Sequence, residues 1–333
     1  MHTFEFVRPP DSSAAIGMAS RARTAQQGAD VRFVAGGTTL LDLMKLNVET
    51  PARLLDISRL PLGKIEATPE GGLMIGATVR NSDLAYNTVV QSAYPVLSQA
   101  ILAGASAQIR NVATTAGNLL QRTRCVYFRD TAMPCNKREP GTGCPAITGA
   151  NRMLAVLGTS DQCIATNPSD MCVALAVLEA TIHVQGPRGK RAIAFGDFHL
   201  LPGKTPNRET ALEPGDLITH VTLPPPVAGS KQAYLKLRDR ASYEFALASA
   251  AVVLTVAGGK VTRARIALGG VATKPWRSPE AEAALVGQTA DAATFRKAGE
   301  AAMRGAKPQS ENGFKIELAK RCLAHALQTA ATA

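Results

Sequence analysis

Apolar residues in the first 223 positions alternate with polar ones in several short runs. Such alternation, rich in Val, Ile and Leu, predicts strands. The expected strands cover residues 3–9, 31–35, 52–58, 64–68, 72–79, 181–186, 189–195 and 217–223. Apolar residues at helical spacing predict helices, the first of them capped by Asp11. The expected helices cover residues 12–27, 40–46, 82–103 with an interruption at Pro95, and 171–180.

Pro224, Pro225 and Pro226 end the last of these strands, since proline cannot donate a ladder hydrogen bond. We therefore expect a domain boundary there, with domains at 1–223 and 224–333. Beyond it, residues 233–271 read as alternating strands joined by Gly258 and Gly259. The expected helices begin after Ser278, after Asp291 and at Phe314. This pattern predicts an α+β fold.

Composition is that of a globular protein. The chain has 333 residues, of which 46% are hydrophobic, enough for one large or two medium cores. Its net charge of +11 is spread along the sequence, and aromatic residues make up only 5%. Because nucleic-acid binders concentrate basic and aromatic residues in patches, we expect no nucleic-acid partner.

The N-terminal segment carries an acidic residue and has no apolar core of the kind found in secretory signals. Residues 84–109 are uncharged, but Asn87, Gln91, Pro95 and Gln99 argue against a membrane span. By itself the chain is expected to be cytoplasmic. The five histidines stand in no triad or metal-protease motif, so we expect no hydrolytic catalysis and assign no catalytic residue.

Five of the six cysteines fall between residues 114 and 172. Cys125, Cys135, Cys144 and Cys163 are too widely spaced for the short chelating pairs of ribbon-type zinc sites. Disulfides are a second reading, although a chain of this size has little need of them. A third reading is an iron–sulfur site. A basic surface loop with unrelated cysteines is a fourth.

Charge near these cysteines bears on the choice. The segment from 121 to 139 carries five basic residues against two acidic ones, Asp130 and Glu139. The basic residues are Arg122, Arg124, Arg129, Lys137 and Arg138. Cations of this kind offset the negative charge of a thiolate-ligated cluster and favour thiolate over thiol.

A glycine turn follows the strand at 31–35. The turn consists of Gly36, Gly37, Thr38 and Thr39 and precedes a helical segment. Glycine lets a ligand come close to the backbone, and the start of the helix offers free N–H groups to a diphosphate. The spacing matches neither a Rossmann fingerprint nor a P-loop. An ordinary turn is the alternative.

Several motifs together carry a family resemblance. VAGGTTLLDLMK, TTAGNL, RTRCVYFRD, PCNKREPGTGC and IATNPSD occur in this order over much of the chain. The sequence resembles the FAD-binding subunits of the xanthine dehydrogenase and aldehyde oxidase, or molybdenum hydroxylase, family. It is most similar to flavin subunits of bacterial periplasmic-type aldehyde oxidoreductases, which carry a [4Fe-4S] cluster. It is also related to the flavin subunit of 4-hydroxybenzoyl-CoA reductase.

The resemblance implies a two-part FAD-binding domain of the PCMH type at 1–223. An iron–sulfur loop at about 121–165 would interrupt it. A C-terminal domain similar to that of carbon monoxide dehydrogenase flavoproteins would follow at 224–333. Together they specify the α+β class predicted above.

By the same resemblance, FAD would be held by two turns and by three further residues. The first turn would bind the pyrophosphate with Val34, Ala35, Gly36, Gly37, Thr38, Thr39 and Leu40. The second turn supplies Thr114, Thr115, Gly117 and Asn118, with Ala116 where many relatives have glycine. Asp170 could cap the following helix or accept from FAD, or do both. Ile218 is expected near the adenine, and Lys236 of the Y-x-K motif near the flavin.

The resemblance also implies that Cys125, Cys135, Cys144 and Cys163 bind the [4Fe-4S] cluster. Cys172 competes with Cys163 for the fourth position. We prefer Cys163, because Cys172 falls on the first turn of an apolar helix, where buried structural thiols are common. Cys322 is expected to face a core.

The implied function is electron transfer within a heterotrimer. A large molybdenum-cofactor subunit would oxidise an aldehyde, and a small [2Fe-2S] subunit would pass the electrons to FAD here. A small molecule or redox protein would accept them. An export signal on a partner would place the complex in the periplasm. The alternatives are a subunit of a 4-hydroxybenzoyl-CoA reductase-like or heterocycle-oxidising enzyme, and a cofactor-free scaffold stabilised by zinc or disulfides.

Overall fold

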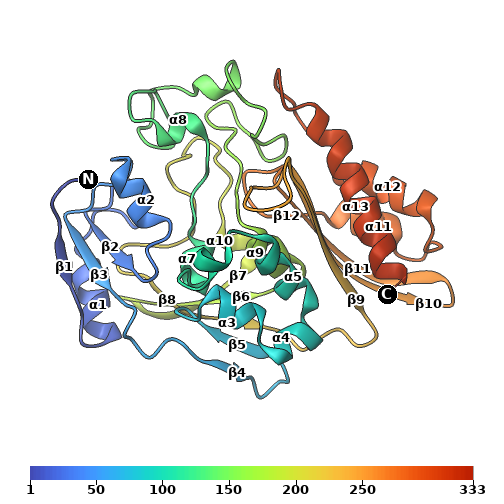
Figure 1. The fold of residues 1–333 in the computed structure, drawn as a ribbon, viewed down its shortest axis with the longest axis horizontal. Coiled ribbons are helices and arrows are strands. Elements are labelled where there is room, and N and C mark those ends of the chain that lie inside the picture. Colours follow the sequence, from blue (N-terminus) through green and yellow to red (C-terminus); the bar gives the residue numbers. More distant parts are fainter. Residues whose placement is uncertain (333) are drawn as a thin grey trace.

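The structure, a computed structural model, describes residues 1–332 and arranges them around three sheets (Figure 1). The first is parallel in the order β1-β3-β2. Its strands are β1 (Glu5–Val7), β2 (Val31–Val34) and β3 (Arg53–Asp56). The accompanying helices are α1 (Ser12–Ala19) and α2 (Leu40–Lys45). This part lies at the left of Figure 1, in blue.

Helix α1 is shorter than the sequence predicted. Asp11 caps it as expected, accepting a hydrogen bond from the Ala14 N–H at 2.8 Å. The helix ends at Ala19, and the expected continuation to Gln27 is wrong. Past the helix, Gln26 and Gln27 donate to the carbonyls of Thr210 and Val48, tertiary contacts that a local pattern does not reveal.

The second sheet is antiparallel, in the order β4-β5-β8-β6-β7. Its strands are β4 (Ile65–Ala67), β5 (Leu73–Gly76), β6 (Thr181–Gly186), β7 (Gly189–Ala194) and β8 (Leu217–Leu223), with α10 (Phe195–Phe198) after β7. The pairings β4–β5 and β6–β7 confirm the two hairpins that the alternation predicted. Residues 200–216, which connect α10 to β8, form a long loop that returns toward the first sheet (Figure 1).

Short helices cover one face of this sheet (Figure 1). They are α3 (Asn81–Ala85), α4 (Thr88–Ala93), α5 (Pro95–Ala103), α6 (Ala107–Arg110), α7 (Thr115–Leu119) and α9 (Asp170–Val177). The region expected as one helix interrupted at Pro95 is three helices, because Asn87 caps α4 through two N–H groups and Pro95 starts α5. All eight residues of α9 are buried, so this helix forms the centre of the largest core.

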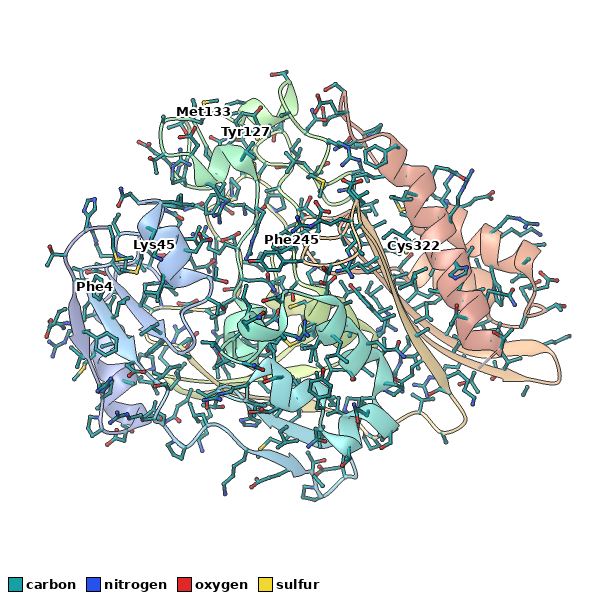
Figure 2. All side chains as sticks on the ribbon, in the orientation of Figure 1. Phe4, Lys45, Tyr127, Met133, Phe245 and Cys322 are labelled. Atoms are coloured by element: carbon teal, nitrogen blue, oxygen red, sulfur yellow. The ribbon has the colours of Figure 1, made fainter. Side chains whose placement is uncertain are left out.

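The third sheet is antiparallel in the order β12-β11-β10-β9. Its strands are β9 (Lys231–Leu237), β10 (Ala248–Ala257), β11 (Lys260–Gly269) and β12 (Trp276–Arg277). Three helices follow: α11 (Pro279–Leu285), α12 (Ala292–Ala302) and α13 (Phe314–Thr332). Their predicted starts are confirmed, with Ser278 and Asp291 accepting N–H groups at the first two. Cys322 of α13 is buried in the core of this domain, as expected (Figure 2).

Residues 120–165 form an irregular loop, green at the top of Figure 1, that contains α8 (Val126–Arg129) and the 3-10 helix η1 (Pro145–Ile147). A small core holds it together, built around Phe128, Ala146 and Ile164. Asn136 also fixes the loop, since its side-chain oxygen accepts from Gly141 and Gly143. Among residues 1–332, no helix is long and apolar enough to cross a membrane.

Candidate cofactor sites

A cavity of about 790 Å³ opens where the turn before α2 meets α7, α9 and β9. Its size is within the range of about 300–1,000 Å³ that is typical of small-molecule sites. Sequence-predicted residues from four elements line it: Thr38, Thr39, Gly117, Asn118, Asp170 and Lys236. The structure thus brings together side chains that are almost 200 positions apart in the chain.

The glycine turn lies against a smaller cavity. Residues 34–40 line it together with Thr114 and Gly117, so the two predicted turns face the same space. Glycine is required at position 36, because a Cβ there would lie 2.1 Å from the Val112 carbonyl oxygen. Gly37 has φ +70°, a conformation that side-chain-bearing residues rarely adopt. The first turn therefore packs closely against the Val112 backbone, and both turns line the same cavity.

The second turn is the start of a helix. Thr114 caps α7, and its hydroxyl accepts from the Gly117 N–H. Thr115 is almost fully buried and donates to the Val79 carbonyl, so its side chain is held by the protein itself. The Asn118 side-chain oxygen accepts from the Ser169 hydroxyl at 2.7 Å. This contact joins the second turn to the start of α9.

Asp170 does not cap α9. The cap is Ser169, whose hydroxyl accepts from the Cys172 N–H, so the expectation that Asp170 performs this role is wrong. The Asp170 carboxylate instead accepts from the Tyr234 hydroxyl at 2.5 Å and from Lys236 Nζ at 2.8 Å. Burial, and next to it the Asp170 charge, raise the pKa of Tyr234 well above its ordinary value. Ile218 is buried in the core on β8.

The four predicted cluster cysteines line one cavity in the irregular loop. Cys125, Cys135 and Cys163 are buried and Cys144 is partly exposed, and none of the four is in a disulfide. Burial raises the pKa of Cys125 to about 12. Burial also raises the pKa of Cys163, with Lys137 opposing the shift. The raised pKa values favour the protonated thiols of Cys125 and Cys163 near neutral pH.

Cys172 is separate from these four. It lies on α9 with no exposed surface, within the largest hydrophobic core. Throughout residues 1–332, no three His, Cys, Asp or Glu side chains are placed to hold a single metal ion.

The basic residues of the loop have distinct contacts. Arg129 forms two hydrogen bonds to the Asp42 carboxylate, at 2.8 and 3.1 Å, which tie the loop to α2. Arg138 donates to the carbonyls of Tyr127 and Phe128. These two arginines fix the loop, whereas Lys137 lines the cysteine cavity itself.

Comparison with known proteins decides the family. Residues 2–226 match the FAD binding domain in molybdopterin dehydrogenase, and residues 232–330 match the CO dehydrogenase flavoprotein C-terminal domain. The chain belongs to this molybdenum hydroxylase flavoprotein family. It is an oxidoreductase subunit with an FAD-binding domain.

Individual relatives agree. The chain is 53% identical to the aldehyde oxidoreductase FAD-binding subunit PaoB of Escherichia coli (strain K12), covering 98% of both chains. It is 29% identical to the carbon monoxide dehydrogenase medium chain of Afipia carboxidovorans, covering 89% of this chain and 84% of that one. Among solved structures, carbon monoxide dehydrogenase from Hydrogenophaga pseudoflava aligns with a TM-score of 0.77 and 26% identity, covering 99% and 98%.

The geometry of this flavoprotein fits FAD. The two closely approached turns suit a diphosphate, and the adjoining larger cavity has room for a ring system. Asp170 and Lys236 add a buried polar pair at its wall. These features agree with the FAD-binding domain that the comparison assigns to residues 2–226.

Sequence reasoning missed three residues that line the larger of the two cavities, which we call the flavin cavity. They are Tyr243, Glu244 and Phe245. They lie in the loop between β9 and β10, and Figure 2 shows Phe245 near the middle of the molecule. The Arg124 guanidinium lies over the Phe245 ring, 4.7 Å from its centroid. Desolvation by burial lowers the pKa of Arg124 to about 10. Two aromatic residues and an acid within a short polar connection were the signal that could have found this loop.

Proposed function

We propose that this flavoprotein is the FAD- and [4Fe-4S]-binding electron-transfer subunit of a molybdenum-dependent aldehyde oxidoreductase. The observation that carries the proposal is that two consecutive residues line the two candidate cofactor cavities. Arg124 lines the flavin cavity, and the next residue, Cys125, lines the cysteine cavity. When bound, FAD accepts electrons singly and releases them in pairs, which suits it to a junction between one-electron centres and a two-electron acceptor.

For FAD, we propose that residues 34–40 and the turn of Thr114, Gly117 and Asn118 hold the diphosphate through backbone N–H groups. The shared cavity between these turns supports this role. Lys236 and Asp170 would then lie near the isoalloxazine, whose polar edge they could orient. Two expected contacts have less support, since Thr115 donates to the backbone and Ile218 is buried in the core.

For the cluster, we propose Cys125, Cys135, Cys144 and Cys163 as its ligands. Support comes from their common cavity, from the absence of disulfides among them and from the cation of Lys137 nearby. Four thiolates are the usual ligands of a [4Fe-4S] cluster. Cys172, fully buried on α9, is not part of this set. We place the iron–sulfur loop at about 121–165 and the boundary between the two domains after Leu223.

The partners follow from the proposed chemistry. The relatives are named a FAD-binding subunit and a medium chain, terms that describe multi-subunit enzymes. We propose that a large molybdenum subunit oxidises the aldehyde, that a small [2Fe-2S] subunit delivers electrons to FAD, and that a separate acceptor removes them. The sequence identity of 53% to an aldehyde oxidoreductase subunit favours aldehydes over heterocycles or a benzoyl-CoA reductase reaction.

Anaerobic reduction tests this function. The chain is purified with its partner subunits, and an aldehyde is added while flavin absorbance is followed. We expect the flavin band to bleach in the complex and to remain unchanged in the isolated chain. An unbleached flavin in a complex that contains molybdenum cofactor and [2Fe-2S] clusters would refute the proposal.

The cluster ligands are tested separately by iron content. Cys163→Ser should remove the iron, whereas Cys172→Ala, a nearly volume-conserving change, should retain it. Retention of full iron content by Cys163→Ser would refute the ligand set. Iron loss in Cys172→Ala with Cys163→Ser unaffected would move the fourth ligand to Cys172.

A further inference from the structure

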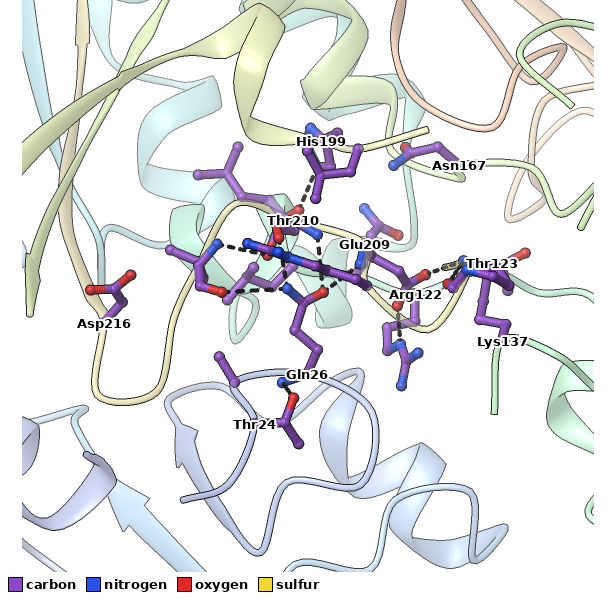
Figure 3. A pocket seen from close by; sticks show the side chains of 18 of the residues that line it. Thr24, Gln26, Arg122, Thr123, Lys137, Asn167, His199, Glu209, Thr210 and Asp216 are labelled. Atoms are coloured by element: carbon purple, nitrogen blue, oxygen red, sulfur yellow. Dashed lines mark hydrogen bonds and ion pairs between the residues drawn. The ribbon is translucent and has the colours of Figure 1, made fainter. Parts of the chain in front are cut away.

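Glu209 binds two cations, Arg122 and Lys137, and all three side chains line one common cavity (Figure 3). Each cation also reaches one of the two candidate cofactor cavities. Its Oε1 accepts from Lys137 Nζ at 2.9 Å, and its Oε2 accepts from Arg122 Nε at 2.5 Å. Lys137 lines the cysteine cavity, and Arg122 lines the cavity of the glycine turn. One carboxylate therefore touches a side chain from each candidate cofactor site.

The three residues form a largely buried group. Arg122 and Lys137 are each less than a tenth exposed. Arg122 also donates to Glu49 and Gln27, and its guanidinium lies over the ring of Phe128. Two cations and two carboxylates thus balance inside the protein. Because buried charges are costly without partners, loss of Glu209 would leave both cations incompletely compensated.

The backbone around Glu209 is also fixed. Its N–H donates to the Gln26 side chain, and its carbonyl accepts from the Leu200 N–H at 2.9 Å. Although burial opposes ionisation, the charges of Arg122 and Lys137 lower the pKa of Glu209 to about 2. Glu209 is therefore an anion held in one place near neutral pH.

Arg122 has capacity for another contact. Its Nη2 is buried and, within the described part of the chain, has no hydrogen-bond partner. An anion in the cavity of the glycine turn would attract the Arg122 guanidinium. The positions of Arg122 and Lys137 are both set by the Glu209 carboxylate. Occupancy of one site can thus change the energy of the other through the shared partner.

We propose that Glu209 is a positioning residue that couples the two cofactors, so that occupancy of the cluster site changes the affinity for FAD and the reverse. The inference rests on the proposed cluster in the cysteine loop. Through Lys137, the Glu209 carboxylate also sets the net charge next to the cluster. Without this carboxylate the positive charge of Lys137 is no longer compensated. That charge favours the more negative, reduced cluster and raises its reduction potential.

A double-mutant cycle in the assembled complex tests the coupling. FAD is removed and titrated back into wild type, Cys135→Ser, Glu209→Gln and the double variant. We expect the cluster-free Cys135→Ser change to alter FAD affinity about tenfold when Glu209 is present, within the usual range of coupling between sites. In the Glu209→Gln background the same change should matter by less than about twofold, the scatter of independent sites.

Cluster potentials give a second readout that a purely structural role would not produce. Glu209→Gln should raise the cluster potential and Lys137→Met should lower it. Glu213→Gln is the matched control on the same loop, since Glu213 is half exposed and pairs with surface arginines. It should change neither FAD affinity nor potential. If Glu209→Gln fails to fold, Lys137→Met replaces it in the double-mutant cycle, because it removes the contact between Glu209 and the cysteine cavity.

The outcomes separate the two proposals. Wild-type complex without iron would refute the cluster and the coupling together. Iron present, with an equal effect of Cys135→Ser in both Glu209 backgrounds, would refute the coupling alone. Potentials that shift in the same direction in Glu209→Gln and Lys137→Met would also overturn it.

Discussion

Lys236 on β9 and Asp170 on α9 form a buried ion pair with an N–O distance of 2.8 Å. The two residues come from the two matched domains, and their side chains are 4% and 9% exposed. Lys236 also donates to the Ala103 carbonyl at the end of α5. The domains are therefore joined by a charge pair at the wall of the flavin cavity.

Breaking this pair from one side should destabilise the protein. Lys236→Met leaves the Asp170 charge buried and uncompensated, and such losses cost about 3–5 kcal/mol. Urea unfolding of the isolated chain measures the effect. The double variant Lys236→Met/Asp170→Asn should recover part of the loss, because no lone buried charge remains. A double variant as unstable as the sum of the single changes would contradict this account.

Gly36→Ala should abolish FAD retention. The added Cβ would meet the Val112 carbonyl oxygen at 2.1 Å, so the turn must move away from its neighbour. Flavin content per chain after gel filtration is the measurement. Gly196→Ala is the control, since a Cβ at that position meets nothing within 4 Å and the φ angle is ordinary. Equal flavin content in both variants would show that the turn does not bind the cofactor.

Lys315 should make stability depend on pH. It lies at the start of α13 with no exposed surface and donates to the carbonyls of Met153 and Leu154. Burial lowers its pKa from 10.5 to about 7. The folded chain then binds fewer protons than the unfolded chain between these values, so stability from this group rises with pH there, by up to about 1.4 kcal/mol per pH unit.

Comparison with Lys315→Met isolates that dependence. The free energy of unfolding is measured for both proteins from about pH 6 to about pH 11, a range that spans the lowered pKa of about 7 and the ordinary pKa of 10.5. The difference between wild type and variant should move in favour of wild type as the pH rises from 7. A constant difference across the range would show that Lys315 titrates normally.

Phe245→Ala should expose the flavin cavity. Arg124 lies over the ring and both residues line that cavity, so removal of the ring opens a wall of the space in which we propose that the isoalloxazine lies. Quenching of flavin fluorescence by iodide should increase relative to wild type. Phe314→Ala is a suitable control, since Phe314 also pairs with an arginine, Arg152, but at the start of α13. The control should leave quenching unchanged.

Much of the fold follows from local pattern. The hairpins, the strand that ends at Leu223 and the starts of the C-terminal helices need only alternation, turn residues and capping side chains. Helix lengths were less accessible: α1 ends at Ala19, and the segment after it is held by the contacts of Gln26 and Gln27 with distant partners. Asp170 was assigned the capping role of its neighbour Ser169, since both residue types cap helices.

In the candidate sites, too, local motifs could be recognised from the sequence and long-range contacts could not. The turns and cysteines were found because they belong to motifs that a sequence displays. Glu209 was not found, since its partners Arg122 and Lys137 lie 87 and 72 positions away. No local property of residues 205–213 indicates a carboxylate that is paired with two buried cations. Long-range ion pairs of this kind become visible only when the chain is folded.

Cofactor stoichiometry tests the central claim most directly. The complex is isolated without oxygen, the three subunits are separated, and FAD, iron and acid-labile sulfide are quantified on this chain alone. We expect one FAD with about four irons and four sulfides per chain. FAD without iron or sulfide would contradict the iron–sulfur site, and a chain with neither FAD nor iron would contradict the account as a whole.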